Sequence, residues 1–194
     1  MSNGTNGSKN TLIGVGIIAL VLIVGIGWTI SGYNRVVAMD ENVKTAWAQV
    51  DNQLKRRYDL IPNLVETVKG YAAHERGVFE HLADARTKYF QAQDVKGKIE
   101  AAGELERALS RLLVLRETYP QLKANESFLK MMDSLEGTEN RLSVERKRYN
   151  DAVRTLNTYI RTVYGHFFAG LAGVTKAEYY QIPEAEKAAP KVKF

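Results

Sequence analysis

Four charged side chains occupy positions at which a helical repeat predicts apolar contacts. Arg57 and Glu75 fall on the first repeat of the chain, and Glu139 and Arg146 fall on the second. A charge between packed helices is costly unless it is paired, so we expect Arg57 to face Glu139, or Glu75 to face Arg146, across antiparallel helices. Other polar residues surround them. The predicted polar core or interaction site comprises Arg57, Asp59, Asn63, His74, Glu75, Glu139, Asn140, Arg146 and Asn150.

This polar set has two interpretations. Buried polar groups set the register of packed helices, which is a purely structural role. The alternative is a pocket or docking site for a partner.

Metal binding and catalysis find no support in the spacing of the reactive residues. His74 and His81 lie seven residues apart, but Tyr71 and Val78 stand where the Glu-x-x-His pattern of di-iron bundles needs glutamate. The same Val78 excludes HExxH. Nucleophile elbows, Gly-rich phosphate loops and Ser-x-x-Lys arrangements are absent. We therefore expect no metal, no cofactor, no catalytic residue and no enzymatic activity.

The amino-acid composition excludes some kinds of chemistry and of binding partner. The chain has no cysteine, which excludes a disulfide and a thiol nucleophile. Its net charge of +5 arises from 27 basic and 22 acidic residues that are interspersed. Such a mixed surface is not the basic stripe of a nucleic-acid-binding protein.

An uncharged apolar run, TLIGVGIIALVLIVGIGWTI, covers residues 11–30. About 20 helical residues cross a bilayer, so we predict a transmembrane helix over residues 11–32 behind a flexible tail over 1–10. A cleaved signal peptide is the alternative, but the run exceeds a usual signal core and only Lys9 supplies positive charge before it. The predicted location is the cell (inner or plasma) membrane, crossed once, with the lipid bilayer as a partner.

The elements that position the charges are long helices. From Val43 to Tyr89, seam residues alternate spacings of four and three, which predicts one helix over residues 33–92 with a kink at Pro62. A reversal at Pro62, giving two antiparallel helices, is the alternative. The first predicted turn is at residues 94–98.

The helices after residue 98 are predicted from amphipathic runs and from the residues that start or end a helix. An amphipathic run ends at Tyr119 because Pro120 follows, and Asn125 is a candidate N-cap. A second seam then runs from Phe128 to Val163, and Gly165 is a candidate C-cap. We predict an all-α fold: a transmembrane helix, then an antiparallel up-and-down bundle of three to four long helices over residues 33–165.

Residues 166–194 lack a long periodicity and are predicted to form a short irregular tail. Its aromatic part is expected to cover a face of the bundle or to lie at the membrane interface. The predicted contact residues are Phe167, Phe168, Leu171, Tyr179 and Tyr180.

Several long segments resemble the LemA family of bacterial membrane proteins. They are YNRVVAMDENVKTAWAQVDNQLKRRYDLIPNLVETVKGYAAHE, ETYPQLKANESF, LEGTENRLSVERKRYNDAVRTLN and the closing APKVKF. The sequence departs from the family at Val163-Tyr164-Gly165-His166, where members commonly show Phe-Pro. The resemblance implies a single-pass membrane protein with a helical bundle and no established enzymatic activity. Some relatives are linked to the formation of intracellular membrane organelles, and others are encoded near membrane-stress proteases.

Two functions remain open. The first is a non-enzymatic, membrane-anchored scaffold in membrane organisation or envelope stress, which presents the bundle to other proteins or to a second copy of the chain. The second is a lipid-contacting protein that shapes membranes. We expect the bundle to lie outside the cytoplasm.

Overall fold

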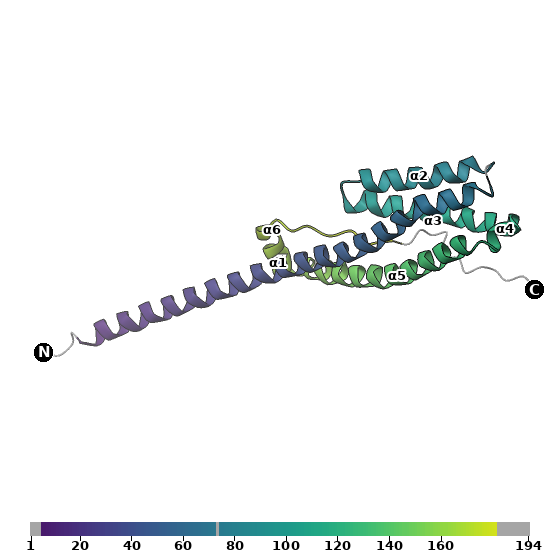
Figure 1. Cartoon of the computed structure of the whole chain (residues 1–194). Helices are drawn as coiled ribbons and strands as arrows, with labels where there is room; N and C mark the ends of the chain where they lie inside the picture. The colour runs from purple at the N-terminus through teal and green to yellow at the C-terminus, as the bar shows by residue number, and fades with distance from the viewer. Residues whose placement is uncertain (1–4, 73, 182–194) are drawn as a thin grey trace, which may run out of the picture. The chain divides into compact units, whose positions relative to one another are not determined.

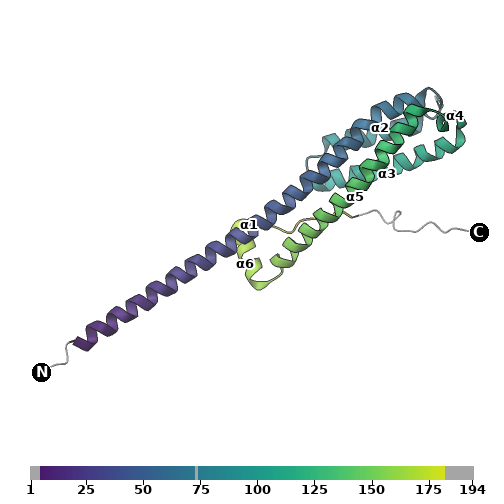
Figure 2. The ribbon, with the colours of Figure 1, turned by 60° about the horizontal axis from the view of Figure 1, so that its bottom comes forward.

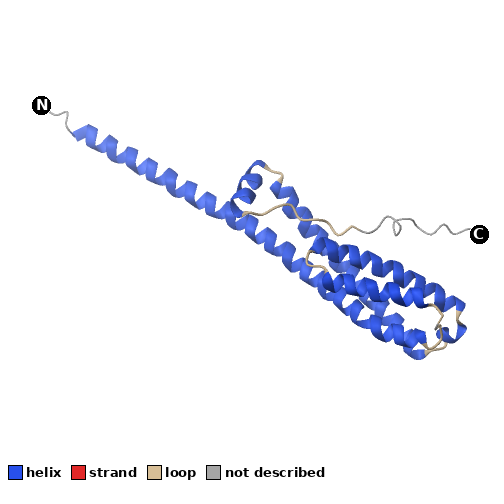
Figure 3. Cartoon of the chain, turned by 90° about the horizontal axis from the view of Figure 1, so that it is seen from above, coloured by secondary structure: helices blue, strands red, loops and turns tan. Residues whose placement is uncertain are grey.

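The computed structural model describes residues 5–72 and 74–181, and every regular element in these ranges is a helix (Figures 1 and 3). The helices are α1 (Thr5–Lys69), α2 (Arg76–Gln91), α3 (Val95–Thr118), α4 (Pro120–Lys123), α5 (Glu126–Ile160) and α6 (Val163–Ala172). The prediction of an all-α protein is confirmed for this part of the chain. The chain divides into two compact units, each described separately below.

The N-terminal unit comprises residues up to 43 together with residues 154–177. Its first part is the apolar stretch of α1, where exposure stays high, from 69% at Leu12 to 56% at Ile30. With a mean hydropathy of 2.5 over its most apolar window, this helix is long and apolar enough to cross a membrane. Residues 5–10, predicted to be a flexible tail, belong to α1. Residues 1–4 lie outside the described residues.

The core unit comprises, among the described residues, 44–72, 74–153 and 178–181. Here the prediction of one helix over residues 33–92 is wrong, because α1 ends at Lys69 and α2 starts at Arg76. The amides of Tyr71 and Ala72 both bond to the Val68 carbonyl, at 2.9 Å each, and close the turn. The seam keeps its phase through the break because both helices turn their apolar faces to one core. Periodicity alone therefore cannot reveal the reversal.

Pro62 lies inside α1, which continues through it, so the alternative of a reversal at this proline is also wrong. A kink at Pro62 stays a prediction. The predicted turn at residues 94–98 is wrong after Asp94, because α3 starts at Val95. The candidate N-cap Asn125 is confirmed. Asp94 caps α3 by accepting a hydrogen bond from Gly97 N at 3.0 Å, and Asn125 Oδ1 accepts one from Phe128 N at 2.8 Å. Pro120 opens α4.

The core of this unit is built on the predicted seams. Tyr58 of α1 stacks on Tyr89 of α2 with ring centroids 4.2 Å apart, and both side chains are buried. Because residue 58 meets residue 89, α2 runs back along α1. Next to it, α2 and α3 lie side by side (Figures 1 and 2). The largest fully buried side chains in the unit include Leu54, Tyr58, Ile61, Leu64, Leu82, Tyr89, Leu105, Leu112, Leu122, Phe128 and Tyr149.

The prediction of an irregular tail from residue 166 is wrong for its first part, because α6 covers Val163–Ala172. Gly165 is not a C-cap. It lies in the first turn of α6, where Thr162 Oγ1 accepts from its amide at 3.0 Å, and a Cβ on it would come within 1.9 Å of the Tyr159 carbonyl oxygen. The helix ends instead at Gly173, whose φ of 67° is left-handed. The tail from residue 182 lies outside the described residues.

Candidate functional site

A buried cluster of two arginines and two glutamates joins three helices of the core unit. Arg57 on α1 is 3% exposed, and its Nη1 donates to Glu106 Oε1 on α3 and to Glu139 Oε2 on α5. Arg146 Nη1 on α5 donates to Glu139 Oε1 at 3.2 Å, and Arg146 Nη2 lies 3.7 Å from Glu106 Oε1. Two positive and two negative charges therefore balance within the cluster. A balanced cluster lowers the cost of removing these charges from water.

The two carboxylates of this charge cluster compete for the same guanidinium groups. Burial raises the pKa of Glu139 above its ordinary value of 4.5, and the nearby Glu106 adds to the rise. Arg57 and Arg146 act in the opposite direction. The Nε atoms of both arginines are buried and have no hydrogen-bond partner among the described residues. Arg57 and Arg146 thus turn their terminal nitrogens, rather than Nε, to the carboxylates.

A short C-terminal segment, residues 178–181, runs past this cluster. The Tyr180 ring lies under the Arg146 guanidinium, 4.7 Å from ring centroid to Cζ. Asn150 holds the backbone of Tyr180 in both directions: its Nδ2 donates to the carbonyl at 2.9 Å, and its Oδ1 accepts from the amide at 2.8 Å. Tyr149 Oη also donates to the Glu178 carbonyl at 2.8 Å. Side chains of α5, rather than a neighbouring strand, therefore satisfy this extended backbone.

The same amide pairing recurs within the N-terminal unit. Asn157 Nδ2 donates to the Ala177 carbonyl at 2.8 Å, and its Oδ1 accepts from the Ala177 amide at 3.0 Å. A single amide side chain satisfies both polar groups of one extended residue, which is what a strand partner otherwise does.

The structure brings together only part of the predicted polar set. The Arg57–Glu139 pair is present. The alternative pair is not: Glu75 accepts from Tyr119 Oη at 3.2 Å, and Arg146 joins the charge cluster. The remaining predicted members other than Asn150 are exposed on the surface, namely Asp59, Asn63, His74 and Asn140. Asn63, His74 and Asn140 are adjacent to seam positions, and Asp59 lies midway between two of them. The sequence pattern therefore did not distinguish side chains that point inward from those that point outward.

Two polar residues inside the core unit were not predicted from the sequence, the part-buried Glu106 and the buried Asp51. Glu106 follows the seam residue Leu105. Asp51 is 9% exposed and accepts from Tyr89 Oη at 2.6 Å, Lys98 Nζ at 2.8 Å and Lys55 Nζ at 2.9 Å. Burial alone raises the pKa of Asp51, but these hydrogen bonds prevail and hold it below the ordinary 3.8. Only its i,i+4 relation to Lys55 is visible in the sequence.

Of the predicted tail contacts, Phe168 and Tyr180 are buried. The others are exposed, namely Phe167, Leu171 and Tyr179.

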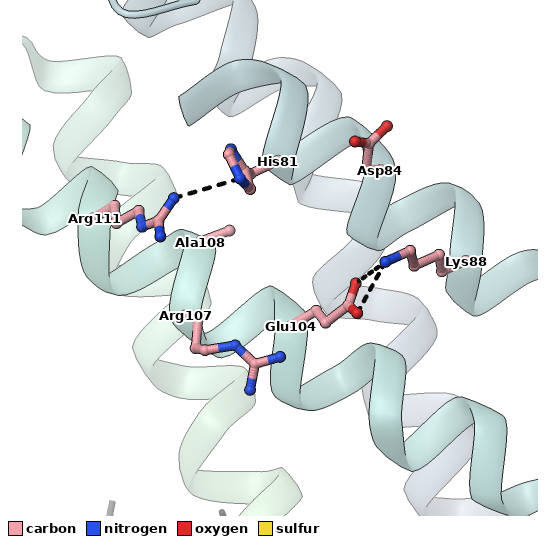
Figure 4. Close-up of a pocket in the computed structure, with 7 residues that line it drawn as sticks. All are labelled: His81, Asp84, Lys88, Glu104, Arg107, Ala108 and Arg111. Atoms are coloured by element: carbon pink, nitrogen blue, oxygen red, sulfur yellow. Dashed lines mark hydrogen bonds and ion pairs between the residues drawn. The ribbon is translucent and has the colours of Figure 1, made fainter. Parts of the chain in front are cut away.

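A surface pocket of about 340 Å³ opens between α2 and α3 (Figure 4). Lys88 Nζ holds Glu104 at 2.8 and 2.9 Å. His81 Nδ1 contacts the Gly77 carbonyl, and His81 Nε2 lies 3.5 Å from Arg111 Nη1. The lining residues are His81, Asp84, Lys88, Glu104, Arg107, Ala108 and Arg111.

This α2–α3 pocket has an excess of cations. Arg107 makes no hydrogen bond or ion pair with the described residues, and the one such contact of the Arg111 guanidinium among them is to the His81 ring. The described residues contain no group of three or more His, Cys, Asp or Glu side chains arranged to hold a metal ion. The arrangement therefore suits the recognition of an anion rather than a reaction.

Fold and site together define an all-helical, membrane-associated protein in which nothing among the described residues indicates catalysis. The LemA family model matches residues 46–194, and the chain belongs to this family.

Curated relatives carry two names. Magnetosome protein MamQ 2 of Paramagnetospirillum magneticum is 28% identical, over 85% of this chain and 70% of that protein. Magnetosome protein MamQ of Magnetospirillum gryphiswaldense is 26% identical, over 84% and 70%. Protein LemA of Metamycoplasma hominis is 21% identical, over 88% and 80%. The resemblance found in the sequence is thus confirmed at the level of the family.

Proposed function

We propose that this LemA-family chain is a single-pass, membrane-anchored scaffold that holds a protein partner at the bilayer surface without chemistry of its own. The observation that carries the proposal is the unbroken α1. One helix contains the apolar stretch and also supplies Arg57 and the stacked Tyr58 to the core unit.

In this proposal the helices of the core unit form an antiparallel bundle, and the charge cluster sets their register. A buried ion network in a helical protein is better suited to specifying one arrangement than to adding stability. Each charged side chain of the cluster is already paired with another member of the cluster, so the cluster is poorly suited to bind a partner. The docking surface is then on the outside of the bundle.

The α2–α3 pocket is the surface that we assign to the partner. Arg107 and Arg111 project from α3 into solvent and pair with no carboxylate among the described residues. Guanidinium groups bind carboxylates in a bidentate geometry. The expected occupant is therefore an acidic segment of another protein.

Site-specific crosslinking in native membranes tests this assignment. A photoreactive amino acid replaces Arg107 in one sample and Arg141, an exposed arginine of α5, in the control. The partner recovered only through position 107 is purified and titrated against the wild type, R107E/R111E and R141E. R107E/R111E replaces two attractive contacts with the acidic partner by two repulsive ones at exposed positions. We expect it to bind the partner about tenfold more weakly than the wild type. Equal binding by all three proteins, or recovery of lipid and monomer alone, counts against the scaffold.

A second function, contact with lipid that shapes the membrane, is favoured by α6. Its apolar side chains Val163, Phe167 and Leu171 are 85%, 59% and 57% exposed. The relatives named as magnetosome proteins make a role in membrane organisation the natural form of this alternative. Tubulation or vesiculation of reconstituted liposomes by the full chain supports it, and unchanged liposomes oppose it.

Location in the cell membrane with the bundle outside the cytoplasm completes the proposal. The chain has no cysteine, so the single-cysteine variants S2C and R141C can each be labelled with a membrane-impermeant maleimide on intact cells. Labelling of position 141 but not of position 2 is expected. The reverse result places the bundle in the cytoplasm. A second copy of the chain as partner is tested by crosslinking between differently tagged copies.

A further inference from the structure

Helix α6 packs on α1 just where the apolar stretch ends. The Trp28 ring meets Tyr164 edge-on at 5.7 Å and Phe168 at 5.0 Å between ring centroids. The ring of Phe168 sits directly over Gly32, where a Cβ would come within 2.2 Å of it. Both helices belong to the N-terminal unit. One face of α6 is thus fixed at the level of residues 28–32, next to the last apolar residues of the run.

The other face of α6 is apolar and open. Val163, Phe167 and Leu171 follow one another at spacings of four, which places them on one side of the helix. They are 85%, 59% and 57% exposed, and Tyr164 beside them is 64% exposed. A helix this apolar is rarely left facing water, and its position beside Trp28 is the level at which aromatic residues gather at membrane interfaces.

The segment of the chain that carries α6 bears charge of one sign. The sequence from residue 152 to residue 177 contains no aspartate or glutamate, although Asp151 and Glu178 stand at its borders. Within this range a pocket of about 430 Å³ lies beside the helix, lined by Ile160, Arg161, His166, Ala169, Gly170, Val174, Thr175 and Lys176. The side chains of Arg161, His166 and Lys176 bond to no carboxylate among the described residues. Cations beside an exposed apolar face are the pattern of a helix that lies on an anionic bilayer.

We propose that α6 lies in the bilayer surface and that the pocket beside it binds the phosphate of an anionic phospholipid through Arg161, His166 and Lys176. Phe167 and Leu171 enter the boundary between headgroups and acyl chains. The interfacial layer is about 5–8 Å thick on each side, and α1 rises about 10 Å from Trp28 to Arg35, so α6 and the first charge of α1 fall within or just outside this layer. Helix α6 therefore sets the depth of α1 in the membrane. The inference rests on the proposed anchoring but not on the proposed partner.

The position of α6 is tested with the full chain reconstituted into nanodiscs that contain phosphatidylglycerol. A spin label is attached to the single-cysteine variant F167C, and to V144C on α5 of the core unit as control, where the native valine is 50% exposed. The label at 167 is expected to be reached by oxygen and shielded from a water-soluble nickel complex, and the label at 144 to show the reverse. Equal access of the nickel complex to both positions overturns the proposal.

The headgroup site is tested by the phosphatidylglycerol that stays bound to detergent-purified protein, measured by native mass spectrometry. Two basic groups near an anionic surface contribute about 1 kcal/mol each, so R161Q/K176Q is expected to weaken retention about 30-fold. R141Q/K147Q removes two exposed cations of the core unit and is expected to change nothing. Circular dichroism establishes that both variants are folded. Equal retention by the two variants refutes the site.

Two further experiments distinguish a lipid phosphate from free phosphate, and the proposed lipid site from the proposed partner site. If inorganic phosphate displaces the lipid from wild-type protein at millimolar concentration, the pocket is a site for free phosphate and the lipid assignment is wrong. R161Q/K176Q is also expected to retain crosslinking at position 107. Loss of lipid with intact partner crosslinking supports the lipid site alone, and a failed crosslink with intact lipid binding refutes only the scaffold.

Discussion

Replacing Arg57 by methionine leaves two carboxylates facing each other without their shared cation. Methionine keeps much of the length and the apolar volume of arginine, so the substitution removes charge with little cavity. Breaking a buried ion pair from one side costs about 3–5 kcal/mol. Here the low end applies, because the side chains of Glu106 and Glu139 keep 22% and 35% of their surface exposed and Arg146 still contacts both. We expect the free energy of unfolding to fall by about 3 kcal/mol at pH 7.

The pH dependence of R57M identifies the cause of the loss. Glu139 already has a pKa above 4.5 in the folded wild type, and removing Arg57 raises it further. A raised carboxyl pKa means that the folded state holds the proton more tightly than the unfolded state. The free energy of unfolding therefore falls as the pH rises through the pKa of Glu139, and it falls more steeply in the R57M variant. The deficit of R57M relative to wild type is expected to shrink as pH falls from 7 toward 5.

Urea unfolding of the full chain in detergent, followed by far-ultraviolet circular dichroism, measures this deficit at each pH. The double variant R57M/E106Q is the matched control, because it removes one carboxylate and leaves Glu139 paired with Arg146, and it is expected to recover part of the stability. A deficit that stays constant from pH 5 to pH 8, or a double variant less stable than R57M, refutes the electrostatic account.

Three further predictions test other contacts. Because the pKa of Asp51 is lowered in the folded state, ionised Asp51 adds to the free energy of unfolding above pH 3.8, and this contribution is lost as the pH falls below 3.8. The free energy of unfolding of D51N should be about 2 kcal/mol lower at pH 7 and should depend less on pH in acid, as measured by urea unfolding. N150A should speed hydrogen exchange of the C-terminal segment about tenfold, whereas the exposed-site control N140A should not; equal exchange in both contradicts the pairing. G165A should destabilise the turn into α6 by about 1–3 kcal/mol, because a Cβ there meets a carbonyl at 1.9 Å, whereas G170A meets nothing within 4 Å; local hydrogen exchange distinguishes them.

Local chemistry in the sequence was sufficient for several features of this protein. The helix over the apolar run, the cap at Asn125 and the end of a helix before Pro120 were predicted correctly, because each depends on neighbours within a few residues. Many of the residues on the predicted seams are indeed buried, because a repeat of four and three residues indicates which side of a helix packs against other helices. The same signal gave two alternative ion pairs, of which the structure contains Arg57–Glu139.

Tertiary structure decided what these local signals leave open. The break between Lys69 and Arg76 preserves the repeat, so only the packing of Tyr58 on Tyr89 shows that the chain reverses there. Glu106 and Asp51 acquire their roles from side chains about 40 or more residues away along the chain. Helix α6 was taken for an irregular tail because ten residues are too few for a clear period, and its packing on α1 gives them a face. A sequence records which side chains a helix turns inward, whereas the partner that each one meets depends on where the chain has folded back.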